Sequence, residues 1–203
     1  MEGSRRGWRS ACAVAAASGA LAVGCGGGER QDANEPAGTF KVAVTDASFP
    51  ERQSIAGSST MRVTVRNADT RTIPDIAVTI TADDAEGGGG FTSRSADAGL
   101  SDPTTPLWIV DSEPRGGGTA YVSTWALGPL PAGQTRSFVW RVTPVVAGSH
   151  TLRYRVAAGL NGRARAQTPS GDDPSGVFRV MVSRTPPQAT VDPKTGDVVT
   201  ASP

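Results

Sequence analysis

The chain has 203 residues, of which 20 are lysine or arginine, 19 are aspartate or glutamate and one is histidine. This length fits one domain or at most two. The near-neutral charge gives no electrostatic case for nucleic-acid binding, and one histidine with two cysteines is too few for a zinc or copper site of the usual kind.

Residues 1–24 have the pattern of a secretory signal. Arg5, Arg6 and Arg9 precede an apolar run of small residues at 11–23. That run is too short to anchor the chain stably across a bilayer. An amphipathic N-terminal helix is the alternative, but no charge interrupts the run. Because the arginine pair lacks the rest of a twin-arginine pattern, we interpret it as ordinary signal charge, and the choice between Sec and Tat export stays open.

The segment LAVGC at 21–25 resembles the lipobox of bacterial lipoproteins, in which a small residue precedes a cysteine that is lipidated and becomes the new N-terminus. Ala22 stands where the family usually has leucine. The resemblance implies a diacylglyceryl thioether and an N-acyl group on Cys25, and two or more acyl chains give durable membrane attachment. Ordinary signal cleavage near Ala20 or Ala22, which would leave Cys25 free, is the alternative.

Processing at Cys25 would change the composition of the chain. Cys12 would leave with the signal and Cys25 would hold the lipid, so no cysteine would remain for a disulfide or a metal site. An exported domain without disulfides must be held by its core. The remaining chain has 17 basic and 18 acidic residues. Its abundance of arginine, alanine and glycine is typical of a GC-rich bacterial genome.

Residues 25–38 are polar or glycine-rich and predict a flexible linker. Beyond them, apolar and polar residues alternate in short runs, as expected for strands with one buried face. Seven runs are convincing and the run at 107–110 is weak. The convincing strands are expected at 40–45, 61–66, 76–80, 121–125, 138–142, 152–156 and 178–182.

The stretch from 119 to 156 holds five of the ten aromatic residues of the domain, so we expect the core to form around it. Trp125 and Trp140 are expected in the core. Two glycine-rich segments, 83–106 and 157–176, are predicted to be long surface loops, which are usually functional or disordered. Residues 184–203 are predicted to be a loosely ordered tail, with a small hairpin at 191–199.

The pattern predicts an all-β fold over residues 39–183, a single immunoglobulin-like antiparallel β-sandwich of about seven to eight strands. The segments VTVRNADTRTIPDIAVTI (63–80) and LGPLPAGQTRSFVWRVTPVVAGSHTLRYRV (127–156) resemble bacterial immunoglobulin-like domains of the CARDB and DUF11 type. In those domains an asparagine ends one strand and a Leu-x-x-Leu-x-x-Gly turn precedes the next. The resemblance implies a cell-surface sandwich, often in adhesion or envelope proteins, and no catalytic residue.

Arg141, Arg153 and Arg155 lie opposite in parity to the inner residues of their strands, as do Arg62 and Arg66. On adjacent strands they would form one basic outer stripe, with Arg163 and Arg165 extending it. Such a stripe would contact anionic envelope polymer or phospholipid head groups. A solvated sheet face is the favoured interpretation, because nearby acids would neutralise the stripe.

Trp108 lies between two loops and is expected to be the exposed tryptophan, available to stack on a sugar ring. The acids of loop 83–106 offer oxygen ligands for calcium, but their spacing fits no EF-hand. The acids considered are Asp83, Asp84, Glu86, Asp102 and Asp111. His150 is expected to be a surface turn residue.

These features predict a non-enzymatic lipoprotein without cofactor or metal, anchored through Cys25 at the outer face of the cell membrane. Its expected partners are an envelope protein or polysaccharide, and nucleic acid is not among them. The alternative is a carbohydrate- or calcium-dependent binding module that uses loop 83–106 and Trp108.

Overall fold

The computed structural model describes residues 32, 35–84, 90–93, 106–191, 194–196 and 198–200, which belong to one compact unit, Gln31–Pro203. The predicted signal, Cys25 and most of loop 83–106 lie outside these residues. Within the described part of the chain, no helix has the length and apolarity that a membrane crossing requires.

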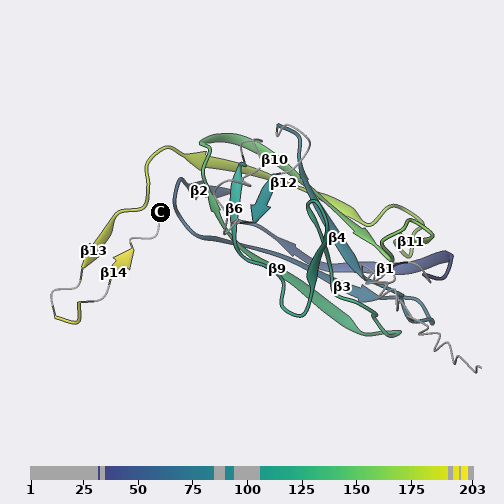
Figure 1. The fold of residues 1–203 in the computed structure, drawn as a ribbon. Coiled ribbons are helices and arrows are strands. Elements are labelled where there is room, and N and C mark those ends of the chain that lie inside the picture. The colour runs from purple at the N-terminus through teal and green to yellow at the C-terminus, as the bar shows by residue number, and fades with distance from the viewer. Residues whose placement is uncertain are drawn as a thin grey trace, which may run out of the picture. The chain divides into compact units, whose positions relative to one another are not determined.

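Two six-stranded sheets form a sandwich (Figure 1). The first sheet contains, in spatial order, β11 (Ala164–Gln167), β1 (Gly38–Ser48), β3 (Ser59–Asn67), β9 (Thr135–Pro144), β6 (Trp108–Ser112) and β5 (Phe91–Ser93). The second contains β2 (Arg52–Ser54), β12 (Ser175–Ser183), β10 (Gly148–Ala157), β4 (Ala77–Ala82), β8 (Thr124–Ala126) and β7 (Gly118–Tyr121). A separate two-stranded sheet joins β13 (Ala189–Val191) to β14 (Val198–Thr200), in the tail segment that was considered for a small hairpin.

One apolar core fills the space between the two large sheets. It forms because every second residue of the long strands is apolar and points inward. Trp140 of β9 is fully buried and meets Trp125 of β8 at 5.4 Å between ring centroids, nearly perpendicular, so this contact joins the two sheets. Phe138 stacks on Trp140 at 5.8 Å. The predicted core positions of both tryptophans are therefore confirmed.

Each predicted strand is present, but the run at 121–125 is interrupted. A turn at Val122 and Ser123, where Ser123 has a φ of 56°, divides this run between β7 and β8. Tyr121 is consequently 46% exposed, although it has the same parity as the buried Trp125. Parity within this run did not predict the burial of Tyr121, because the alternation of inward and outward side chains continues only as long as the strand does.

The expected antiparallel sandwich of seven to eight strands is wrong in strand number and partly in direction. The three pairs β1–β11, β12–β2 and β5–β6 are parallel, so both sheets are mixed. One member of each pair is only three or four residues long and lies at a sheet edge. These short edge strands escape sequence analysis because three or four residues are too few to show an alternation.

The motif residues behind the family resemblance meet in one buried corner. The Asn67 side-chain amide donates to the carbonyls of Arg71 and Leu130, both at 2.8 Å, and Asn67 is completely buried. Leu130 in turn forms an isolated β-bridge with Ile73. Gly133, whose φ is 74°, donates its N–H to the Asn67 carbonyl. The asparagine and the Leu-x-x-Leu-x-x-Gly turn thus tie the β3–β4 loop to the β8–β9 loop.

The turn after Asn67 is closed by an aspartate–arginine pair. Asp69 accepts hydrogen bonds from the Arg71 guanidinium and from the backbone N–H of Lys41. These interactions hold the pKa of the Asp69 carboxyl well below its usual range. Arg71 also lies over the Phe40 ring, 4.4 Å from its centroid, so the turn is fixed to β1 as well as to β3.

Candidate functional site

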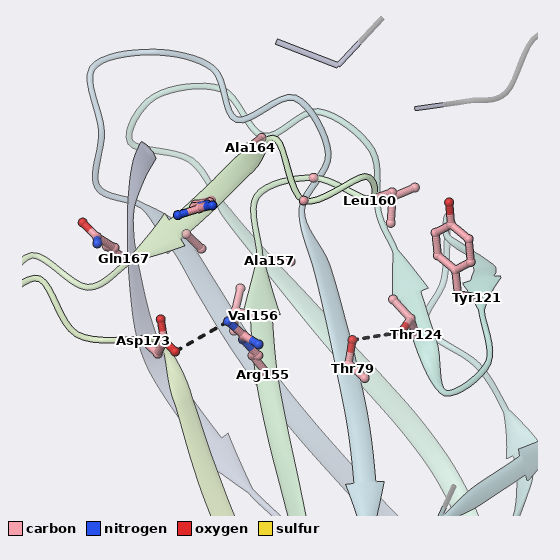
Figure 2. Close-up of a pocket in the computed structure, with 14 residues that line it drawn as sticks. Thr79, Tyr121, Thr124, Arg155, Val156, Ala157, Leu160, Ala164, Gln167 and Asp173 are labelled. Atoms are coloured by element: carbon pink, nitrogen blue, oxygen red, sulfur yellow. Dashed lines mark hydrogen bonds and ion pairs between the residues drawn. The ribbon is translucent and has the colours of Figure 1, made fainter. Parts of the chain in front are cut away.

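A pocket of about 650 Å³ opens at the end of the sandwich where β10 leads into the loop 158–163 (Figure 2). Its wall on the second sheet includes Thr79 and Thr124, whose hydroxyl oxygens lie 2.9 Å apart. Arg155 reaches Asp173 at 3.5 Å on the other side. Residues of β11 and the loop, including Arg165, complete the lining. The pocket is polar and open, with two arginines in its wall.

The loop beside this pocket holds the carboxylate of Glu35. One oxygen, Oε2, accepts the backbone N–H groups of Leu160 and Asn161 at 2.7 and 3.2 Å, and Oε1 accepts that of Ala164 at 3.0 Å. Successive N–H groups that converge in this way form an anion-binding concavity. Gly159 is required there, because a Cβ at this position would overlap the Glu35 carboxylate. We call this arrangement the Glu35 clasp.

Asp32 adds a second attachment three residues earlier. Its carbonyl accepts the Asn161 side-chain amide at 2.7 Å, and its carboxylate accepts the Tyr121 hydroxyl at 3.2 Å. Residues 25–38 were predicted to be a flexible linker, yet Asp32 and Glu35 are both buried. The chain is therefore fixed to the loops of the sandwich before β1 begins.

A second buried carboxylate lies near the clasp. Asp75 accepts the N–H of Gly128 at 2.9 Å. Burial raises the pKa of the Asp75 carboxyl above its ordinary value, the Gly128 hydrogen bond opposes that rise, and the negative charge of Glu35 adds to it. The ionised form of Asp75 is therefore less favourable in the folded protein than in the unfolded chain.

Replacing Asp75 with asparagine is expected to stabilise the protein at pH 7. The pKa of Asp75 is higher in the folded protein than in the unfolded chain. The free energy of unfolding is therefore highest below the unfolded-state pKa, and it falls as the pH rises through the folded-state pKa. Asparagine keeps an oxygen for Gly128 but has no charge to bury. The advantage of Asp75→Asn over the natural protein should be larger at pH 7 than at pH 4 in urea unfolding curves, and an advantage that grows as the pH falls would contradict this account.

The structure separates the arginines that were expected to form one stripe. Arg141 lies on β9 in the first sheet, whereas Arg153 and Arg155 lie on β10 in the second. The outer faces of the two sheets point away from each other, so the prediction of a single stripe is wrong. Arg153 makes a two-pronged contact with Asp83, at 2.7 and 2.8 Å, which lowers the pKa of that carboxyl.

The expectation that Trp108 is exposed is also wrong. Trp108 is fully buried at the start of β6, and its indole N–H donates to the Gln53 side-chain oxygen at 2.8 Å. The rings of Phe49 and Phe91 pack against it, at 5.9 and 6.1 Å between centroids. Burial occurs because Trp108 has the inward parity of β6 and finds a partner for its one polar group. The indole presents no surface on which a sugar could stack.

His150 is buried rather than at a surface turn. It shares the inward parity of β10 with Leu152. Its Nδ1 contacts the Asp84 carboxylate, its Nε2 lies 3.1 Å from the Val146 carbonyl, and its ring meets Trp108 edge-on at 5.2 Å. Both ring nitrogens are therefore engaged with oxygen atoms of the protein.

The acids considered for calcium do not gather in the part of the chain that the structure describes. Asp83 contacts Arg153, Asp84 contacts His150, and Asp111 accepts the Thr143 hydroxyl at 2.7 Å. Glu86 and Asp102 lie outside the described residues. Among the residues that are described, no group of three or more His, Cys, Asp or Glu side chains is placed to hold a metal ion.

No protein-family model matches the sequence, and no curated protein shows significant similarity to it. Solved structures do show similarity. The chain is similar to the CARDB domain of a Pyrococcus furiosus protein, crystallised in complex with di-metal ions, with 12% identity, a TM-score of 0.43, and coverage of 72% of this chain and 96% of that one.

Two other solved structures are similar over a comparable part of the chain. Native alpha-2-macroglobulin from Escherichia coli, from domain MG7 to the C-terminus, matches with 14% identity and a TM-score of 0.43, over 78% of this chain and 21% of that one. Red sea bream transglutaminase matches with 12% identity and a TM-score of 0.38, over 71% and 15%. The chain thus spans about a fifth of the macroglobulin fragment. At identities this low, the similarity concerns the fold alone.

Proposed function

We propose that this protein is a lipid-anchored, non-catalytic domain that acts by contact at the cell envelope. The observation that carries the proposal is the lipobox-like segment at 21–25, which ends at a cysteine. Only six residues separate Cys25 from Asp32, where the chain is already bonded to the sandwich. In the lipidated form the domain would stand directly above the membrane, at the outer face of the cell.

A contact role agrees with how the polar groups of the domain are used. Glu35 and Asn67 bind backbone groups, and His150 is engaged with Asp84 and a backbone carbonyl. Their hydrogen bonds hold loops and strands together. The exposed arginines of the two sheet faces remain for interaction, and the partner we propose is a protein or polymer of the envelope.

Replacing Cys25 with alanine is expected to abolish acylation and membrane attachment. Cells that express the protein would be grown with an alkyne analogue of palmitate, and the protein would be probed for label and for its distribution between membrane and soluble fractions. The natural protein should be labelled and sediment with membranes, because residue 25 would carry a thioether-linked diacylglyceryl group and an amide-linked acyl chain.

Cys12→Ala is the matched control, because it removes the other cysteine of the chain from within the predicted signal. This variant should keep both the label and the membrane association. Absence of label from the natural protein, or equal label in the Cys25→Ala variant, would show that the lipobox interpretation is wrong and that the domain is freely exported.

A further inference from the structure

One end of the sandwich carries a group of exposed cations. This end, which we call the tether end, contains Gly38 at the start of β1 and the loops 68–76, 127–134 and 158–163. Neighbouring strands of the first sheet each place a cation there, and all of these side chains are exposed. The set, which we call the basic band, consists of Arg163 and Arg165 of β11 and its preceding loop, Lys41 of β1, Arg66 of β3 and Arg136 of β9.

The strand register brings these cations to the same end of the sheet. Arg165 is the partner of Thr39, two residues before Lys41, and Arg66 pairs with Ala43, two residues after it, so these three share the outer face. Arg66 also pairs with Thr135, so Arg136 lies at the same level of the sheet but, by the alternation of the strand, on its other face. Neighbouring strands are about 4.8 Å apart, so β11, β1, β3 and β9 bring the band within roughly 15 Å across the sheet.

The cations of the basic band have no acidic partners within the described part of the chain. The ion pairs there join other residues: Arg71 with Asp69, Arg153 with Asp83 and Arg155 with Asp173. Two acids at this end have other partners. Asp69 is bonded to Arg71 and to the Lys41 backbone, and the Glu35 carboxylate is buried in the clasp.

The attachment of the chain places this end toward the membrane in the lipidated form proposed above, on which this inference rests. Asp32 and Glu35 bind the loop 158–163 and the residue that follows it, at the tether end. From Cys25 to Asp32 there are seven peptide steps, which span at most about 25 Å when fully extended. A domain held so closely by this end keeps the basic band near the lipid head groups.

We propose that the basic band binds the head groups of anionic phospholipids, so that the sandwich lies with its tether end against the membrane and its opposite end outward. A cation at the surface of an anionic bilayer contributes about a five-fold gain in binding. The attraction falls off within a Debye length of about 8 Å at physiological salt. Neutralising three of the five cations should weaken the contact about 100-fold.

The test uses the lipidated protein, purified from membranes and reconstituted in vesicles. One cysteine is introduced as a fluorophore site, either Ala132→Cys at the tether end or Ser58→Cys at the opposite end, both at exposed positions. Energy transfer to an acceptor on the lipid head groups reports which end is closer. In phosphatidylglycerol vesicles, transfer from position 132 should exceed that from position 58. In phosphatidylcholine vesicles, or at high salt, the difference should shrink to the one that the tether alone imposes.

The variant Lys41→Gln, Arg66→Gln and Arg165→Gln should reduce the difference in anionic vesicles to the value seen in phosphatidylcholine vesicles. Its control is Arg52→Gln, Arg179→Gln and Arg184→Gln, which removes the same charge from exposed residues outside the band and should keep the full difference. Unfolding curves for both variants establish that they are folded. A difference of the same size in anionic and phosphatidylcholine vesicles, or a reduction in the control alone, would overturn the proposal.

The two proposals fail in different ways. Protein that is not recovered with membranes at all contradicts the lipid anchor. Protein that is anchored, but whose difference in energy transfer between the two ends does not depend on the lipid charge, contradicts only the binding of head groups. A tether-end preference that appears only after acidic envelope polysaccharide is added would assign the basic band to that polymer and overturn the lipid assignment.

Discussion

Replacing Asn67 with alanine is expected to lower the free energy of unfolding by about 2–3 kcal/mol, because two carbonyls, one of them buried, lose their donor. The Asn67 amide, which is itself completely buried, is the donor to the carbonyls of Arg71 and Leu130. Its side-chain oxygen also accepts the N–H of Asp69 at 2.9 Å. The loss would be measured by urea unfolding, followed through tryptophan fluorescence.

The control for this prediction is Thr60→Ala, an exposed position on the same strand. It should change the stability by less than about 0.5 kcal/mol, as surface substitutions usually do. The variant Asn67→Asp separates the loss of the N–H donor from the loss of side-chain volume. Aspartate has nearly the same shape as asparagine and keeps the side-chain oxygen that accepts a hydrogen bond, but it has no side-chain N–H to donate. If Asn67→Asp were as stable as the natural protein, the carbonyls would not depend on that donor.

Removing the Glu35 carboxylate should destabilise the domain by about 2–4 kcal/mol, because three loop N–H groups would lose a charged acceptor. Glu35→Ala is also expected to speed proteolytic cleavage before β1, where the clasp holds the chain. Glu35→Gln keeps one acceptor oxygen and should show an intermediate loss. Glu51→Ala, at an exposed acid, is the control and should be close to neutral.

Gly159 provides an independent check on the same interaction. A methyl group at this position would occupy the space of the Glu35 carboxylate, so Gly159→Ala should cost about as much as Glu35→Ala. Because both changes break one contact, the double variant should be less destabilised than the sum of the two single effects. Full additivity would show that the two residues act separately.

The strands that form the core could be predicted because their alternation is long. In β9 and β10, Phe138, Trp140, Leu152 and Tyr154 lie on the inner face as their parity requires. Parity also identified Arg141 and Arg153 as outward residues. It could not show that they belong to different sheets, because the spatial order of strands depends on which runs pair, and alternation alone does not determine that.

The candidate site was harder to predict, because its contacts join segments far apart in the sequence. Glu35 lies in a polar stretch, and nothing in the composition distinguishes it from an acid in solvent. Its partners lie about 125 residues later. Trp108 was predicted to be exposed because loops flank it. Its parity in a four-residue apolar run was the better evidence, and it indicated burial. Gln53, which satisfies the Trp108 N–H, comes from a strand too short to recognise.

The edges of both large sheets have a further consequence for a protein that would be confined to a membrane plane. All four outermost strands are only three or four residues long: β11, β5, β2 and β7. A long free edge exposes a row of unpaired backbone groups, on which a neighbouring molecule can add a strand. These short strands cover only part of the longer strands beside them, because β11 pairs with β1 at Gly38–Lys41 alone and β2 pairs with β12 at Met181–Ser183 alone. Among the described residues, 42–48 of β1 and 175–180 of β12 are therefore the stretches at which copies crowded on one bilayer would meet edge to edge.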